Sequence, residues 1–185
     1  MRVMSDVAAN LAEIRARVHG AVQRSGRQAD EVSLMVVSKT WPEAVIREAV
    51  DAGQVLFGEN KVQEIVVKAP SMPAHLRWHF IGHLQRNKVR KVLPHVEAIH
   101  SIDSLKLARY TDRLAGELGL SPTVYLEVNL GAEESKHGFG PEELGEVIGE
   151  LATLEHLSVE GLMCIPPSEE EESKARGWFS RLREL

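Results

Sequence analysis

The sequence lacks three features that would each indicate a particular class of protein. It has one cysteine, Cys164, among 185 residues, so it cannot form an intrachain disulfide bond. Its longest apolar runs fall far short of the ~20 residues that a membrane-spanning helix needs. The opening segment is amphipathic and charged, which is unlike a secretory signal. These absences predict a cytoplasmic protein with no membrane partner.

The chain also lacks an excess of positive charge. Its formal net charge is −5, with 26% charged and 43% hydrophobic residues. Such a composition is typical of a soluble globular protein and gives no general attraction to polyanions. Nucleic acid is therefore not an expected partner. The length corresponds to one domain, and no linker or internal repeat divides it.

The hydrophobic pattern predicts an α/β fold. After an amphipathic helix that ends near Ser25, helical segments alternate with six predicted strands, at residues 32–37, 54–58, 77–82, 96–102, 123–130 and 157–165. Asn60 and Asp103 are predicted to cap two of the helices. Short connections favour parallel strands, in a doubly wound sheet or a (β/α)8 TIM-type barrel.

A barrel needs eight β-α units and about 250 residues, so this chain supplies about six of the eight. We therefore expect one barrel domain over residues 1–185 that is incomplete at its C-terminal end. Strands one and six would then be open edges, and the chain would tend to aggregate or need a partner.

Lys39 is the first candidate for a reactive group. It follows the end of the first predicted strand, where α/β proteins gather their functional side chains. Apolar surroundings would lower its pKa and free a neutral amine that can attack an aldehyde. Alternatively, Lys39 only extends its ammonium group to the rim, with its stem packed on Trp41.

Further strand ends strengthen the first interpretation. Five segments occur in order at strand ends or in the loops that follow: VVSKTWP, FGENKVQE, WHFIGHLQRNK, EVNLGAEESKHGFG and GLMCIPP. Together they resemble the pyridoxal phosphate homeostasis proteins, which are related to the barrel domain of alanine racemase. The resemblance implies that Lys39 holds pyridoxal 5'-phosphate (PLP) as a Schiff base. It also implies a role in intracellular PLP homeostasis and delivery, with PLP-dependent apoenzymes as recipients and a monomer or weak homodimer as the assembly.

Three more residues are candidates for the cofactor pocket. Asn60 could hydrogen-bond the ring hydroxyl or a water beside it, or it could serve only as the helix cap. Ile81 and Met163 could line the ring pocket, because strand alternation points both inward, or they could simply fill the core. Lys136 is a second loop lysine, for which transit of the cofactor or a phosphate contact is an alternative to plain solvation.

A racemase-like enzyme is the alternative function. Racemisation needs an acid or base on each face of the substrate carbon, and the partner of the lysine is usually a tyrosine from a second domain. The two tyrosines here, Tyr110 and Tyr125, fall within a predicted helix and a predicted strand. The sequence therefore predicts no enzyme activity.

Two further features bear on ligands. His75, His79 and His83 recur every four residues, but a strand and a turn separate them, so no metal site is predicted. The family's phosphate-binding serine-containing and glycine-serine-threonine segments, and the arginine of its pyridine nitrogen, have no counterpart in residues 1–185. Tight binding of the phosphate is therefore in question.

Overall fold

The architecture is a curved sheet of six parallel strands with helices along its outer side. The computed structural model describes residues 6–131, 137–166 and 172–185. The strands follow one another in chain order, β1-β2-β3-β4-β5-β6. Their bounds are β1 Val36–Val37, β2 Leu56–Glu59, β3 Arg77–Phe80, β4 Ala98–Ile102, β5 Thr123–Glu127 and β6 Ser158–Met163.

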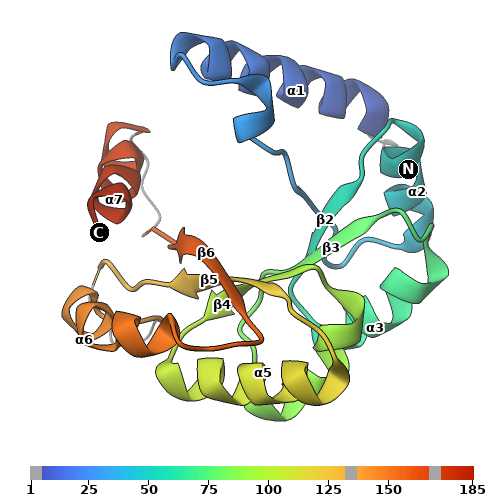
Figure 1. The fold of residues 1–185 in the computed structure, drawn as a ribbon. Helices are drawn as coiled ribbons and strands as arrows, with labels where there is room; N and C mark the ends of the chain where they lie inside the picture. The colour runs from blue at the N-terminus through green and yellow to red at the C-terminus, as the bar shows by residue number, and fades with distance from the viewer. Residues whose placement is uncertain (1–5, 132–136, 167–171) are drawn as a thin grey trace.

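The helices connect these strands in a regular alternation. The α-helices are α1 Val7–Arg24, α2 Glu43–Asp51, α3 Val62–Ser71, α4 Val89–Val92, α5 Leu105–Leu118, α6 Pro141–Leu151 and α7 Glu172–Glu184. Short 3-10 turns are η1 Ala29–Glu31, η2 Arg86–Lys88 and η3 Leu93–His95. Figure 1 shows α2, α3, α5 and α6 along the convex side of the sheet. This one-sided cover is the arrangement of a barrel, and it confirms the barrel over the doubly wound sheet.

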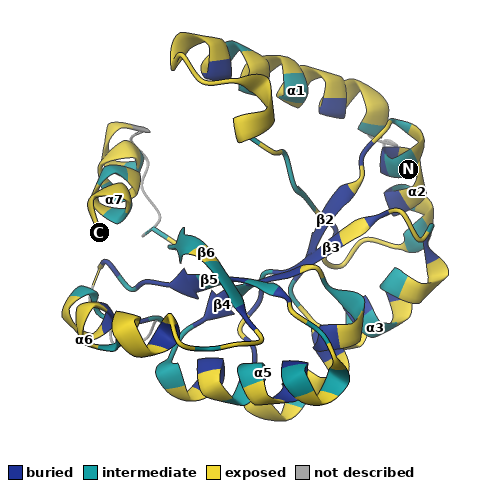
Figure 2. Ribbon diagram, viewed as in Figure 1, coloured by how far each residue is buried: buried dark blue, intermediate teal, exposed yellow. Residues whose placement is uncertain are grey.

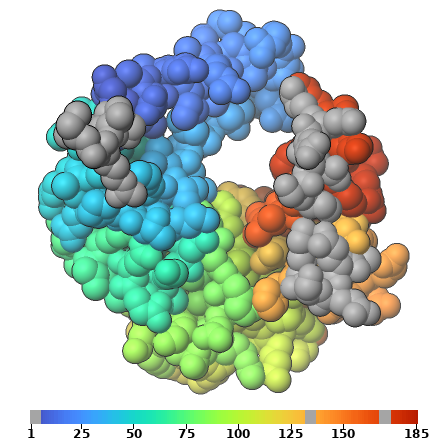
Figure 3. Space-filling view, turned by 180° about the vertical axis from the view of Figure 1, so that it is seen from behind, coloured from blue at the N-terminus to red at the C-terminus, as the bar shows by residue number. Residues whose placement is uncertain are grey.

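The sheet is open between its first and last strands. Among the described residues, β1 pairs only with β2, and β6 pairs only with β5. Figure 3 shows an opening through the molecule, bordered by N-terminal residues on one side and C-terminal residues on the other. The curvature is therefore that of a barrel wall, with β1 and β6 as its two free edges.

The main core lies between the outer face of the sheet and the helices. Strand alternation sends Phe57, Phe80 and Ile99 to this layer, where they are fully buried. Helix α3 contributes Ile65 to the same core, and α5 contributes Leu114. Figure 2 shows β2, β4 and β5 as largely buried, the edge strand β6 as partly buried, and the outer faces of the helices as exposed. This packing fixes the strand ends that carry the candidate site.

Several predicted boundaries differ from the structure. The first strand is only Val36–Val37, because an edge strand has one neighbour and pairs only where that neighbour continues beside it. The prediction that Asn60 caps a helix is wrong, since α3 starts one residue later and Lys61 is its N-cap. Asp103 does not cap α5 either, because the Ser104 hydroxyl accepts the Leu107 N–H instead.

Other boundaries are confirmed or fall elsewhere. Helix α1 ends before Ser25, as its apolar spacing predicts, and α6 begins at Pro141. Ser168 and Glu171 have the three-residue spacing of a capping box in the sequence, but both lie outside the described residues. Among the helices that the structure describes, none combines the length and the apolar character needed to cross a bilayer.

Candidate functional site

Three of the four predicted site residues occupy one row at the carboxyl edge of the sheet. Val37 is paired with Gly58, which is in turn paired with His79. The same register, continued by two residues, places Lys39, Asn60 and Ile81 in adjacent positions. The row of Val37, Gly58 and His79 faces inward, because the Ser38 side chain next to Val37 contacts Glu59 in the outer layer.

Lys39 lies in a tight turn directly after β1. The Ser38 N–H donates to the Gly58 carbonyl at 3.0 Å, and the Trp41 N–H closes the turn on the Ser38 carbonyl at 3.2 Å. Thr40 has a φ of 66°, a left-handed conformation that costs a non-glycine residue about 1–2 kcal/mol. The turn is therefore held by contacts that compensate for this strain.

The structure does not show the desolvation that was expected for Lys39. Its side chain is exposed, and Trp41, the predicted apolar support, is itself 45% exposed. The physical reason is the position of β1, since an edge strand is covered from one side only among the described residues. Lys39 lies just beyond the carboxyl end of β1, as the sequence predicts, but its surroundings are open.

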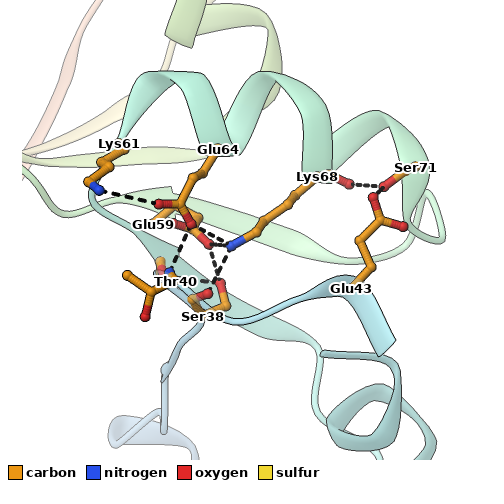
Figure 4. Close-up of polar contacts among 9 residues, drawn as sticks. Ser38, Thr40, Glu43, Glu59, Lys61, Glu64, Lys68 and Ser71 are labelled. Atoms are coloured by element: carbon orange, nitrogen blue, oxygen red, sulfur yellow. Dashed lines mark hydrogen bonds and ion pairs between the residues drawn. The ribbon is translucent and has the colours of Figure 1, made fainter. Parts of the chain in front are cut away.

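A buried polar network between α3 and the end of β2 holds the turn that carries Lys39. Lys68 on α3 donates from Nζ to Glu59 at 2.6 Å, to Glu64 at 2.7 Å and to the Ser38 carbonyl at 2.9 Å. Glu64 also accepts the Thr40 N–H at 2.9 Å. Figure 4 shows how these groups converge between the helix and the turn. Contacts on both sides of Lys39 thus belong to one network.

The charges of this network stabilise one another. Burial alone would lower the pKa of Lys68, but the hydrogen bonds and charges of Glu59 and Glu64 outweigh it and raise that pKa. The hydrogen bond from Lys68 lowers the pKa of Glu64, with further help from the Thr40 N–H. Sequence reasoning missed all three residues, although Glu64 and Lys68 have the i, i+4 spacing of a helical ion pair.

A cavity of about 210 Å³ opens at the same edge of the sheet. It is lined by Ile81, His83, Glu127, Val128, Asn129, His137 and Ile165. Its size is below the ~300–1,000 Å³ of most small-molecule sites, so it suits part of a small ligand such as one ring. Burial raises the pKa of the Glu127 carboxyl, and the nearby Asp103 charge adds to the effect.

Of the remaining candidates, only Ile81 is among the residues that line this cavity. Met163 is half-buried on β6, paired with Glu127. The Asn60 side-chain oxygen is buried and has no hydrogen-bond partner among the described residues. An unpaired buried acceptor is costly, so this oxygen is suited to a ligand or water donor. Lys136 lies outside the described residues.

A pair of histidines, His79 on β3 and His100 on β4, lies on the inner face of the sheet. His79 Nδ1 and His100 Nε2 are 2.9 Å apart, and the His100 ring stacks on Tyr125. Burial lowers the pKa of His79. The pKa of His100 is lowered to about 4, mainly by burial and to a smaller extent by the charge of His79. The four-residue spacing of His75, His79 and His83 does not correspond to one face of a helix, because His79 lies on β3 and points to His100.

This pair predicts a pH-dependent stability. Both folded-state pKa values lie below the ordinary 6.5, so the unfolded chain binds more protons between pH 6.5 and about 4. The stabilisation is complete above about pH 6.5 and is lost as the pH falls through about 4. Urea unfolding from pH 7.5 to 4.5 should show this decline, and His100→Gln should flatten it. The exposed control His75→Gln should keep the wild-type slope, and an equal slope in both variants would contradict the assignment.

Comparison with known proteins identifies the family. The family described as alanine racemase, N-terminal domain, matches residues 9–185. The pyridoxal phosphate homeostasis protein of Pseudomonas aeruginosa is 42% identical over 98% of this chain and 80% of its own length. That of Escherichia coli K12 is 43% identical over 91% of this chain and 74% of its own length. The chain belongs to the pyridoxal phosphate homeostasis protein family.

Solved structures agree with this placement. PipY of Synechococcus elongatus, solved with PLP bound, is 38% identical with a TM-score of 0.83, over 96% of this chain and 79% of PipY. Alanine racemase of Clostridium difficile is only 16% identical, with a TM-score of 0.74 over 98% of this chain and 47% of the racemase. The second match shows the shared barrel fold alone. The homeostasis family and its alanine racemase-like barrel, both predicted from the sequence, are confirmed.

Proposed function

We propose that this chain binds PLP covalently at Lys39 and serves in PLP homeostasis and delivery to PLP-dependent apoenzymes. The observation that carries the proposal is the row of Lys39, Asn60 and Ile81 at the carboxyl edge of the sheet. Relatives named as pyridoxal phosphate homeostasis proteins, 42–43% identical, and PipY with PLP bound support the choice of ligand.

The residues of the row fit the parts of the cofactor. The Lys39 amine would add to the aldehyde carbon, and water would leave as the Schiff base forms. The unpaired Asn60 side-chain oxygen would accept a hydrogen bond from the ring hydroxyl or from a water beside it. Ile81, on the cavity wall, would pack against the ring, with Met163 on the neighbouring wall.

The side chains around the row favour carriage of the cofactor over catalysis. Tyr125 stacks on His100 inside the sheet, and Tyr110 lies on α5 with Arg113 over its ring. The chain has no other tyrosine. Neither supplies the opposite-face base that racemisation requires. With PLP bound, alanine in deuterated solvent should keep its α-proton, and exchange at ~1 per second or faster would favour the racemase alternative.

Titration with PLP tests the role of Lys39 directly. The wild-type chain should develop a near-visible absorbance band, and Lys39→Ala should lose it and bind PLP at least about 10-fold more weakly, ~1.4 kcal/mol. Lys61→Ala is the matched control, since Lys61 is 64% exposed on the neighbouring loop, and it should behave as wild type. A Lys39→Ala protein with the wild-type band would refute the assignment.

A further inference from the structure

We propose that His83, Asp103 and His137 form a binding site for a divalent transition-metal ion of the Zn²⁺ class. The three residues come from the loops after β3, β4 and β5, and their donor atoms all lie within 4.8 Å of one another. His83 Nδ1 is 3.3 Å and His137 Nδ1 is 3.9 Å from Asp103 Oδ2. Ligand atoms about 2.0–2.2 Å from a tetrahedral ion lie about 3.3 Å apart, so the cluster is close to binding geometry.

The backbone that carries His83 is closely packed. A Cβ at Gly82 would lie 2.1 Å from the Asn60 carbonyl oxygen, so only glycine allows this approach of the two loops. On the other side, the Ser101 hydroxyl donates to the Gly82 carbonyl. His83 therefore projects from a fixed turn.

His137 is anchored in a comparable way. Its neighbour Gly138 has a φ of 116°, and a Cβ there would lie 2.9 Å from the Glu127 carbonyl oxygen. The Phe139 N–H donates to that carbonyl at 2.8 Å, and the Phe139 carbonyl accepts the Asn129 N–H at 2.9 Å. The chain thus folds back onto the end of β5 and brings His137 beside His83.

Asp103 has the support that a metal-binding carboxylate needs. The Ser104 hydroxyl donates to Asp103 Oδ1 at 3.0 Å, which leaves Oδ2 for the two imidazoles or an ion. Ser104 is itself fixed as the N-cap of α5. Hydrogen bonds of this kind orient ligands in metal sites. The Asp103 side chain is only 13% exposed, so its position is well defined.

Ion binding requires one rearrangement. The imidazole rings of His83 and His137 are stacked, with centroids 3.8 Å apart and planes inclined by 13°. The lone pairs of parallel rings do not meet at one point, so a ring must turn for both nitrogens to face an ion. The side chains are 42% and 57% exposed, so packing does not prevent this turn. The same exposure leaves coordination positions open to water or to a ligand in the cavity.

The donor set selects the class of ion. Two imidazoles and one carboxylate suit Zn²⁺, Co²⁺ or Ni²⁺, whereas Mg²⁺ and Ca²⁺ prefer oxygen ligands. His83 and His137 line the same cavity as Ile81 and Glu127, so an ion here would lie at the rim of the pocket proposed for the cofactor ring. The ligands do not include Lys39, and the site does not depend on the PLP proposal.

Titration of the tag-free, PLP-free chain with Co²⁺ tests this site. One equivalent should give the visible absorbance of a four- or five-coordinate ion, and Zn²⁺ should displace it. His83→Asn and His137→Asn should each weaken binding at least about 10-fold, since even loss of a supporting residue costs about 10–100-fold. Asp103→Asn should do the same, and the exposed control His75→Asn should leave binding unchanged.

Two results would overturn the site. One is the lack of a saturable absorbance band in the wild-type chain. The other is unchanged Co²⁺ affinity in both His83→Asn and His137→Asn, which lie on the surface and should melt as the wild type does. Lys39→Ala should bind Co²⁺ normally, so a failure of the PLP proposal would leave this result intact.

Discussion

Replacement of Lys68 by methionine is expected to lower the free energy of unfolding by about 3–5 kcal/mol. The Lys68 side chain is 9% exposed and its partner Glu59 is fully buried, so the variant leaves a carboxylate in the interior without its counter-charge. The Ser38 carbonyl loses a donor at the same time. Urea unfolding at pH 7.5 measures the loss.

Two further variants isolate the cause. In the double variant Glu59→Gln/Lys68→Met no buried charge remains unpaired, so most of the lost stability should return. Lys61→Met removes a lysine at the opposite end of α3, whose side chain is 64% exposed and lies 3.9 Å from Glu64, and should cost less than ~1 kcal/mol. Equal losses in Lys68→Met and Lys61→Met would contradict the buried network.

Gly82→Ala is expected to destabilise the chain by about 3 kcal/mol, the upper end of the usual range for overpacking. The new methyl group would meet the Asn60 backbone at 2.1 Å, and neither loop can yield without moving the strand ends. Because Asn60 and Ile81 adjoin this contact, PLP affinity should fall together with stability. Thermal unfolding and the PLP titration measure the two effects.

The chain offers a matched control on α6. A Cβ at Gly145 would meet nothing within 4 Å, and the residue is exposed on the helix. Gly145→Ala should therefore stabilise the chain by about 0.5–1 kcal/mol and leave PLP binding unchanged. A neutral Gly82→Ala variant would show that the two loops are not packed as the structure has them.

The sequence predicts the architecture well because hydrophobic periodicity determines it directly. Six strands and their helices appear in the predicted order, since burial on one or both faces leaves a local pattern. The carboxyl-edge positions of Lys39, Asn60 and Ile81 follow from that order alone.

Features that depend on distant contacts could not be predicted. The Lys68 network joins α3 to the turn after β1, and no local pattern marks Lys68 as buried. Aspartate is a common N-cap residue, which favoured Asp103, but Ser104 is the N-cap of α5. The exposure of Lys39 depends on what covers an edge strand, which the segment VVSKTWP does not encode.

The most direct test of the central proposal is to locate the covalently held cofactor. The PLP-loaded chain is reduced with borohydride, digested with trypsin and mapped by mass spectrometry. Trypsin does not cut at a modified lysine, so attachment at Lys39 should place one adduct on a peptide spanning residues 28–47. An adduct found mainly on Lys136, or spread over the exposed lysines, would contradict the account.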